Sequence, residues 1–290
     1  MRLKCNGKQP PTRWQTFAAR LRYRLRNKLA RRAKVIDGEQ TLRFICHGLM
    51  EEYRARTLYV KEEGTIQWIR DSVRPGDAFL DIGANIGLYT LLAAQQIGDT
   101  GMVYAVEPHI VNVQSLLRNI QANGLQRRVS VLSCALHETS TLLSFNYCSL
   151  DPGTSMSQLD STRDGEEQEF APVACELKHA VAVDHLVATG AMRAPNHVKI
   201  DVDGNELLIL RGMRQLLSGP TPPQTLQVEI NHRYRDALFA FFEEVGFELA
   251  QRHYTLIGKQ QIAAGRHPHE ISHNAIFRPA AAHPARRLAA

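Results

Sequence analysis

The architecture of this chain is set by residues 78–90, which read Ala78-Phe-Leu-Asp-Ile-Gly-Ala-Asn-Ile-Gly-Leu-Tyr-Thr90. Residues 78–82 form the short apolar run that is typical of a buried strand in a parallel sheet. Gly83 and Gly87 let the backbone bend tightly and approach a ligand without an intervening side chain. A helix expected over residues 86–97 points its free N–H groups and positive dipole end into the turn. This succession predicts a site for a nucleotide-like cofactor at the carboxyl edge of a sheet.

The spacing of glycines and acids indicates which cofactor binds. A dinucleotide fingerprint has the pattern Gly-x-Gly-x-x-Gly, but Asn85 and Leu88 stand at the second and third glycine positions. The carboxylate of Asp81 would repel a pyrophosphate, whereas it suits a cofactor with positive charge near the turn. Glu107 ends the next strand, close to the roughly 20-residue offset at which an acid meets ribose hydroxyls. S-adenosylmethionine satisfies both acids, while the alternative is a plain α/β turn with an acidic helix cap.

Strands and helices alternate along the rest of the chain. Strands are expected over residues 78–82, 102–107, 129–135, 197–201 and 225–230, with two late strands near 247–252 and 273–278. Helices are expected over residues 62–73, 86–97, 110–122, 205–217 and 234–245. This order predicts an α/β fold with a doubly wound, mostly parallel sheet and helices on both faces. The polar residues 149–170 interrupt the pattern, either as a lid or acceptor-binding loop or as a solvated insertion.

Five segments of the chain, in matching order, resemble the FkbM-type methyltransferases. They are residues 81–90, 106–108, 119–125, 199–213 and 228–230. The resemblance covers residues 56–278 and implies an S-adenosylmethionine-dependent enzyme with the Rossmann-like class I methyltransferase fold. It also implies methylation of a hydroxyl oxygen on a sugar, glycan, lipid-linked or polyketide-type acceptor. Asp203 stands where the family has Glu and Asn205 where it frequently has His, so the acceptor stays open.

Candidate catalytic residues lie at the ends of two later strands. Asp201 ends one of them, and Glu229 ends the other with His232 just beyond it, so all three are expected to face the crevice of the glycine turn. His232 is the expected general base because an imidazole titrates near neutral pH. Asp201 would orient the acceptor or hold the ammonium of the cofactor, and Glu229 would hold an acceptor hydroxyl. Alternatively, Asp201 and Glu206 cap the next helix, and His232 is an exposed loop residue.

Residues expected to contact the cofactor are Asp81, Gly83, Ala84, Asn85, Gly87, Glu107 and Ala135. No metal site is assigned, because the run from Asp201 to Glu206 lacks the glycine that a calcium loop has at its sixth position. A magnesium site that uses one or two of the acids Asp201, Asp203, Glu206 and Glu229 remains an open alternative. His267, His269 and His273 show no ligand spacing and are interpreted as surface loop residues.

Positive charge is concentrated at the N-terminus. Residues 1–34 hold 12 Lys and Arg without any Asp or Glu, whereas the remaining residues hold 23 Lys and Arg against 29 Asp and Glu. Residues 12–34 predict a basic amphipathic helix with an apolar stripe of Trp14, Phe17, Leu21, Leu25 and Leu29. Such a helix adsorbs to an anionic membrane or a phosphate-rich partner, or packs on its own domain. No nucleic-acid partner is expected, because the body of the chain is acidic.

Composition sets the remaining expectations. The five cysteines lack a Cys-x-x-Cys pair and indicate reduced thiols in a cytoplasm. No 18-residue apolar run predicts a membrane span, and the N-terminus lacks the apolar region of a secretory signal. The expected location is therefore cytoplasmic, with residues 12–34 at the inner face of a membrane if they adsorb.

Three parts are expected along the chain: a basic N-terminal helical segment (1–55), the methyltransferase domain (56–278) and a frayed tail (279–290). Two alternative functions stay open. One is a nicotinamide-dependent oxidoreductase, against which Asn85 and Leu88 argue, and the other is a non-catalytic cofactor-binding scaffold at a membrane surface.

Overall fold

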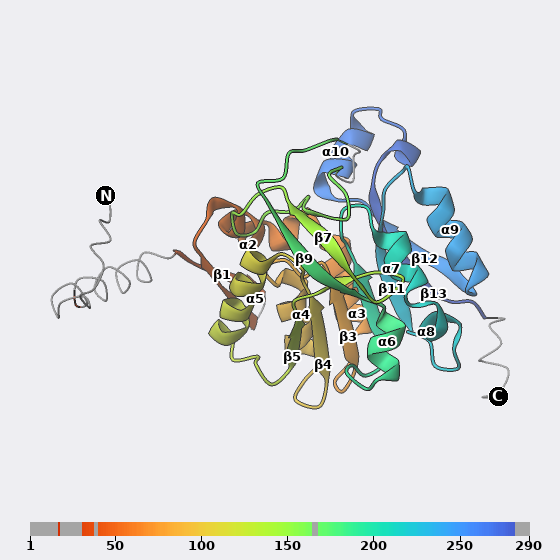
Figure 1. The fold of residues 1–290 in the computed structure, drawn as a ribbon, viewed down its shortest axis with the longest axis horizontal. Helices are drawn as coiled ribbons and strands as arrows, with labels where there is room; N and C mark the ends of the chain where they lie inside the picture. Colours follow the sequence, from red (N-terminus) through yellow and green to blue (C-terminus); the bar gives the residue numbers. More distant parts are fainter. Residues whose placement is uncertain (1–16, 18–30, 38–39, 164–167, 282–290) are drawn as a thin grey trace.

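A seven-stranded, mostly parallel sheet lies at the centre of the molecule (Figure 1). The computed structural model describes residues 17, 31–37, 40–163 and 168–281. In spatial order the strands are β12 (Phe247–His253), β13 (His273–Pro279), β11 (Thr225–Ile230), β10 (His197–Ile200), β3 (Ala78–Ile82), β4 (Met102–Val106) and β5 (Val129–Leu132). The five strands from β11 to β5 are parallel, and β13 is antiparallel to both of its neighbours. The predicted doubly wound sheet is confirmed.

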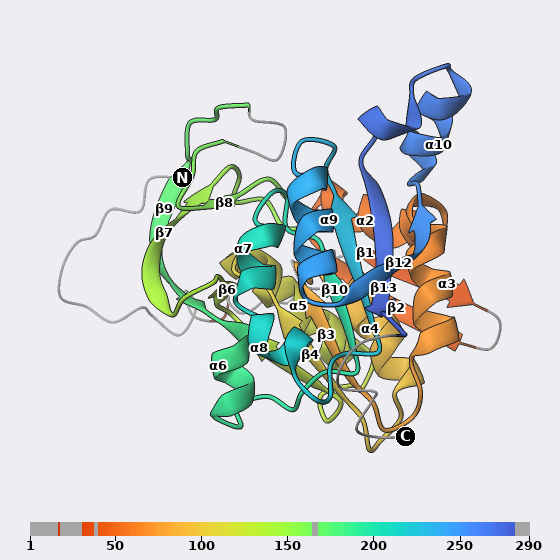
Figure 2. The same cartoon turned by 90° about the vertical axis from the view of Figure 1, so that its right-hand side faces the viewer.

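Helices cover both faces of this sheet, as Figure 2 shows. One face carries α2 (Leu49–Lys61), α3 (Glu63–Ser72), α4 (Leu88–Gln96) and α5 (Ile110–Ala122). The other carries α6 (Val183–Ala188), α7 (Glu206–Arg211), α8 (Arg214–Ser218) and α9 (Arg235–Glu244). The helix predicted over 205–217 is divided into α7 and α8 at Gly212, where an added Cβ would lie 2.2 Å from the carbonyl oxygen of His137. Between β12 and β13 lie α10 (Leu256–Ala263) and a short 3-10 helix (Pro268–Glu270).

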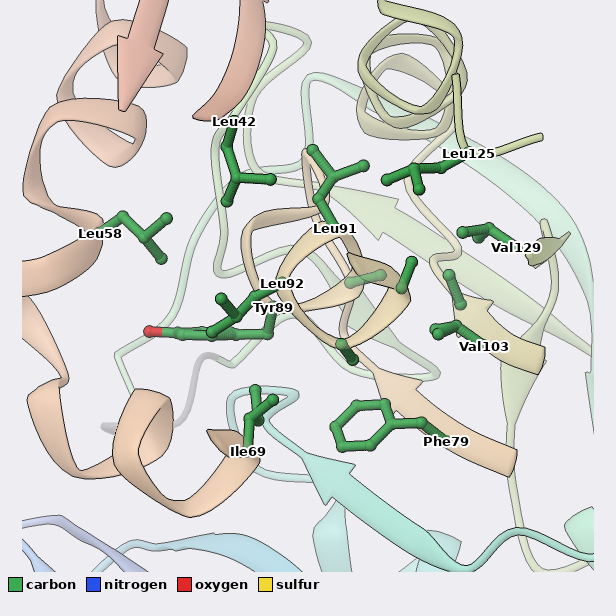
Figure 3. Packing of buried hydrophobic residues seen from close by; sticks show 14 of the residues in the cluster. Leu42, Leu58, Ile69, Phe79, Tyr89, Leu91, Leu92, Val103, Leu125 and Val129 are labelled. Atoms are coloured by element: carbon green, nitrogen blue, oxygen red, sulfur yellow. The ribbon is translucent and has the colours of Figure 1, made fainter. Parts of the chain in front are cut away.

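The glycine turn is anchored in the core by the apolar residues on either side of it. Phe79 of β3 and Leu91 of α4 are fully buried, and they share one cluster with Leu58 of α2 and Ile69 of α3 (Figure 3). Each fully buried side chain of this size contributes about 1.5–3 kcal/mol of stability. The turn between β3 and α4 is therefore held from both ends by packed elements.

An N-terminal hairpin extends this core. β1 (Arg31–Asp37) pairs antiparallel with β2 (Gln40–Cys46), and Leu42 and Phe44 of β2 are buried. The helix predicted over 12–34 is wrong at its C-terminal end, because residues 31–34 lie in β1 and pair with β2. Of residues 12–30, all but Phe17 lie outside the described residues. The predicted boundary at residue 55 falls inside α2, which packs on the same core.

A second sheet lies beside the first and was missing from the sequence-based prediction. Its strands, in spatial order, are β6 (Ala135–Leu136), β9 (Ala174–Val181), β7 (Thr141–Tyr147) and β8 (Gln158–Leu159). The polar stretch predicted as a loop over 149–170 therefore contains β8. Its first part connects β7 to β8 and reaches the carboxyl edge of the main sheet, where Thr154 and Met156 line a cavity.

The order of the main sheet reverses beside β3, which pairs with β4 on one side and with β10 on the other. Ligands of open α/β sheets bind at such a reversal, outside the carboxyl ends of the strands. No helix in the described part of the chain has both the length and the apolar character needed to cross a bilayer.

Candidate functional site

A cavity opens at the carboxyl ends of β3, β4, β10 and β11, where the sheet order reverses. The cavity and the open space at its mouth together have a volume of about 910 Å³. Gly83, Asn85 and Glu107 line it from the turns after β3 and β4, and Asp201, Asp203 and Glu229 line it from the ends of β10 and β11. The cavity therefore joins the glycine turn to the acids at the ends of the later strands. Five of these six residues were predicted site residues, whereas Asp203 was considered only as a departure from the family pattern and as one of the acids that could hold a metal ion.

Position 83 needs a glycine because the end of the neighbouring strand leaves no room for a Cβ. Its φ is +78°, and an added Cβ would lie 1.9 Å from the carbonyl oxygen of Asp201. Its own N–H donates to the carbonyl of Val106 at 3.0 Å. Gly87 has a different reason, because an added Cβ there would lie 2.6 Å from a methyl group of Leu116. Both glycines thus let backbone and helix approach one another closely, and Gly83 places the turn directly against the end of β10.

Glu107 lines the cavity just beyond the end of β4. Its carboxylate accepts hydrogen bonds from the backbone N–H groups of Asn85 at 2.7 Å and His109 at 2.8 Å. Burial raises the pKa of Glu107 to about 7, against the effect of these two hydrogen bonds. A side-chain hydrogen bond from Asn112 adds to these two. A carboxylate offers about four acceptor positions, so acceptor capacity remains for a ribose hydroxyl. The position and the spare acceptor capacity of Glu107 fit the predicted cofactor.

Asp81 lies beneath the glycine turn and outside the lining of the described cavity. It is 1% exposed, its Oδ2 accepts a hydrogen bond from Thr90 Oγ1 at 2.5 Å, and its Oδ1 lies 3.7 Å from Lys199 Nζ. Burial raises the pKa of Asp81, and Lys199 opposes that shift. Asp81 therefore acts on the site through Lys199, and the structure does not bring it to the surface of the cavity.

Lys199 is a site residue that the sequence-based reasoning quoted without assigning it a role. It is 1% exposed, its Nζ lies 3.0 Å from Asp201 Oδ2, and it stands over the ring of Tyr89 at 5.1 Å. Although burial works in the opposite direction, Lys199 lowers the pKa of Asp201 to about 2. Asp201 is therefore ionised throughout the neutral range. The signal for this pair is the spacing Lys-x-Asp at the end of a strand, which places both side chains on one face.

The turn after β10 is tied to the segment between β7 and β8. Asp203 has φ +59°, and its Oδ2 accepts a hydrogen bond from the backbone N–H of Met156 at 3.0 Å. Its carbonyl oxygen accepts one from Gln158 Nε2 at 2.9 Å. Residues 154–157 all line the cavity. The segment predicted as a lid or acceptor-binding loop thus forms part of the cavity wall.

Glu206 and Glu229 lie in different environments. Glu206 accepts hydrogen bonds from the N–H groups of Gly204 at 3.2 Å and Val202 at 3.4 Å, which precede α7. The side chain of Glu206 therefore holds the turn after β10, and the N-cap residue of α7, Asn205, makes no side-chain capping bond. Burial raises the pKa of Glu206 to about 7. Glu229 faces the cavity, where burial and then the charges of Asp201 and Asp203 raise its pKa well above the ordinary value.

The histidines are placed differently from the sequence-based expectation. His232 lies in the turn before α9, outside the lining of the cavity as the described residues define it. The interpretation of His273 as a surface loop residue is wrong, because it begins β13, is 4% exposed and lines the cavity. The cause is the pairing of β13 with β11, which sets His273 opposite Ile230. His267 and His269 are exposed, as expected.

The remaining predicted cofactor residues do not line the main cavity. Ala84 lines a smaller cavity between α2 and the turn, whereas Gly87 is the N-cap residue of α4 and Ala135 is buried in β6. From α2, Arg54 and Lys61 line both cavities, and the sequence-based reasoning missed them because it predicted no helix at the position of α2. Within the described residues, no group of three or more His, Cys, Asp or Glu is arranged to hold a metal ion.

Comparison with known proteins gives a family and a distant relative. Residues 81–255 match the model of the methyltransferase FkbM domain. The hexuronic acid methyltransferase AglP of Haloferax volcanii is 26% identical over 186 residues, which cover 60% of this chain. The matched part spans 65% of the length of that relative.

Solved structures with a similar fold include two methyltransferases. An S-adenosylmethionine-dependent methyltransferase from Aquifex aeolicus aligns with a TM-score of 0.42 at 11% identity, over 79% of this chain and 95% of that one. An S-adenosylmethionine-dependent O-methyltransferase from Thermotoga maritima aligns with a TM-score of 0.43 at 10% identity, over 86% of this chain and 77% of that one.

Proposed function

Because the chain belongs to the FkbM family of methyltransferases, we propose that it transfers the methyl group of S-adenosylmethionine to a hydroxyl oxygen of a sugar acceptor. The family and the strand order make it an S-adenosylmethionine-dependent methyltransferase of the class I fold. This family assignment argues against the nicotinamide-dependent oxidoreductase considered above. What we propose beyond the family is that the methyl group goes to oxygen and that the acceptor is a sugar.

The observation that carries the proposal is the continuous cavity from Glu107 to Glu229. Glu107 is placed to accept a hydrogen bond from a ribose hydroxyl, and the turn at Gly83 and Asn85 brings backbone close to the ligand. When bound, the cofactor supplies an electrophilic methyl group on a sulfonium. This chain contributes orientation, since holding the acceptor oxygen in line with that methyl group removes much of the barrier.

The acceptor end suits a polyhydroxylated molecule. Asp203 and Glu229 present carboxyl groups to the cavity, and such groups accept hydrogen bonds from hydroxyls. Asp201, held ionised by Lys199, lines both the main cavity and the smaller one beside the glycine turn, and either orients the acceptor or holds the ammonium of the cofactor. The similarity to the hexuronic acid methyltransferase of Haloferax volcanii supports a sugar acid as the acceptor.

Glu229 is the proposed general base. A base works best when its pKa lies near the operating pH, and the pKa of Glu229 is raised by burial and by neighbouring acids. His232 was the base expected from the sequence. Among the described residues, it is not one of those that line the cavity. The carboxylate of Glu229 would accept the hydroxyl proton as the acceptor oxygen bonds to carbon.

The test is methyl transfer from isotopically labelled S-adenosylmethionine to a panel of uronic-acid oligosaccharides and their neutral counterparts. Products are identified by mass spectrometry and then treated with mild alkali, which cleaves a methyl ester but leaves an ether intact. We expect an alkali-stable methyl group on an acidic sugar. An alkali-labile product would contradict transfer to a hydroxyl, and label on nitrogen or carbon would contradict transfer to oxygen altogether.

A further inference from the structure

Two cations of α2 face the cofactor end of the site. Arg54 and Lys61 are seven residues apart, or two helical turns, and therefore lie on the same face of α2. Both line the main cavity. Both also line the smaller cavity between α2 and the glycine turn, whose other walls include Gly83 and Asp201. Lys199 and Glu62 complete the charged lining of this smaller cavity, so that three cations and two carboxylates surround the space beside the turn.

The neighbours of these side chains leave charge available to a ligand. Arg54 Nε donates a hydrogen bond to the carbonyl of Gly153 at 2.5 Å, which holds the guanidinium over the cavity. Lys61 Nζ lies 3.4 Å from Glu62 Oε1, and the Lys61 side chain is 42% exposed. Against the effect of burial, Lys199 first and then Lys61 and Arg54 lower the pKa of Asp201. The field of both cations therefore reaches across the cavity.

We propose that Arg54 and Lys61 bind the carboxylate of the amino-acid tail of the cofactor, while Asp201 on the opposite wall binds its ammonium group. The tail is a zwitterion, so it needs opposite charges on two sides of one small space. A guanidinium matches a carboxylate with two parallel hydrogen bonds. With Glu107 on the ribose, this arrangement orients the tail and the adenosine on either side of the glycine turn.

Arg54 and Lys61 would also suit the carboxylate of an acidic acceptor. Binding measurements distinguish this carboxylate from that of the cofactor tail. S-adenosylhomocysteine carries the full tail, whereas 5′-methylthioadenosine has the same adenosine and thioether without it. The inference rests on the cofactor assignment and is independent of the proposed acceptor. We expect the intact protein to bind S-adenosylhomocysteine more tightly than 5′-methylthioadenosine in isothermal titration.

Arg54→Met and Lys61→Met should each weaken binding of S-adenosylhomocysteine by about tenfold to a hundredfold, the size expected for a charged hydrogen bond. Their affinity for 5′-methylthioadenosine should stay at the wild-type value. Arg56→Met is the matched control, since Arg56 lies on the same helix with a side chain that is 70% exposed and paired with Glu52. It should leave both affinities unchanged.

Three results would overturn the proposal, each in a different way. Unchanged affinity for S-adenosylhomocysteine in both variants would assign the cations to the acceptor. If Lys61→Met lost the same affinity for both ligands, the role of Lys61 would be structural. The Lys61 variant is the more decisive one, because Arg54→Met also removes the hydrogen bond from Arg54 to the carbonyl of Gly153. If the wild type binds neither ligand, the cofactor assignment itself fails and the proposal fails with it.

Discussion

Lys199 Nζ lies 3.0 Å from Asp201 Oδ2, so that a buried ammonium group holds a cavity-lining carboxylate in its ionised state. The same ammonium lies 3.7 Å from Asp81 Oδ1 on the neighbouring strand. One cation therefore serves two carboxylates, one beneath the glycine turn and one facing the site. The charge and the position of Asp201 therefore both depend on Lys199.

Replacing Lys199 should be costly, because Asp81 and Asp201 would then be left as carboxylates without a buried cation. We expect Lys199→Met to lower the free energy of unfolding by about 3–5 kcal/mol in urea denaturation at pH 7. Lys259→Met, at an exposed position paired with Glu63, is the control and should change stability by less than about 0.5 kcal/mol. Equal stability of the two variants would mean that the buried ammonium contributes little.

Cofactor binding should release protons near neutral pH. Burial raises the pKa of Glu107 to about 7, so the free protein carries a partly protonated carboxyl there. A ribose hydroxyl that donates to Glu107 favours its charged form, lowers this pKa and expels the proton. Titration of S-adenosylhomocysteine at pH 7 in buffers of different ionisation enthalpy should show this release, and Glu107→Gln should abolish it. Buffer-independent heats in the wild type would remove Glu107 from the ribose site.

Turnover should rise with pH through the titration of Glu229. The raised pKa of this group means that the carboxyl is protonated at low pH, where it cannot accept the hydroxyl proton. Activity is therefore lost as pH falls through the folded-state pKa. Glu229→Gln should reduce kcat by about 10²–10⁴-fold and flatten the pH profile.

Two variants serve as controls for the assignment of Glu229. Glu248→Gln, on the surface beside Arg278, should leave kcat unchanged. His232→Ala should also keep most of the activity between pH 6 and about pH 9, because the imidazole lies outside the described cavity lining. Loss of activity in His232→Ala with full activity in Glu229→Gln would return the role of base to the histidine.

The basic N-terminal segment is proposed to adsorb to anionic membranes. Residues 1–30 bring nine Lys and Arg without an acid, and each cation contributes ~1 kcal/mol near a negative surface. We expect the full chain to co-sediment with anionic vesicles at low salt and to be released at high salt, whereas the chain from Arg31 onward stays in solution. Vesicles of zwitterionic lipid are the control. Equal sedimentation of both chains with anionic vesicles would place the contact elsewhere.

The main sheet followed from the sequence because its strands carry local signals. The apolar run at 78–82, the glycines after it and the acids at strand ends each report their own surroundings, and the observed β3, β4, β10 and β11 lie where these signals placed them. The second sheet lacks such signals. In β9, the inward positions include Glu176 and Lys178 while Leu177 is exposed, so the hydrophobic pattern of this strand is weak. Outside that sheet, β1 follows a basic stretch that favours a helix.

The site was predictable where one residue acts alone and less so where residues act on one another. Glu107 and Glu229 were found from their places at strand ends, and the structure brings both to the cavity. His273 was misjudged because its burial depends on β13 inserting beside β11, a pairing between distant parts of the chain. Arg54 was missed for the same reason, since only tertiary packing brings α2 over the turn.

The central claim is that the cavity between Glu107 and Glu229 holds the cofactor with its reactive sulfur toward the acceptor end. A crystal structure of the complete chain with S-adenosylhomocysteine tests this most directly. The account requires a ribose hydroxyl within hydrogen-bonding distance of the Glu107 carboxylate and the thioether sulfur facing the space beside Glu229. A cofactor bound with its ribose away from Glu107, or with its sulfur turned from Glu229, would contradict it.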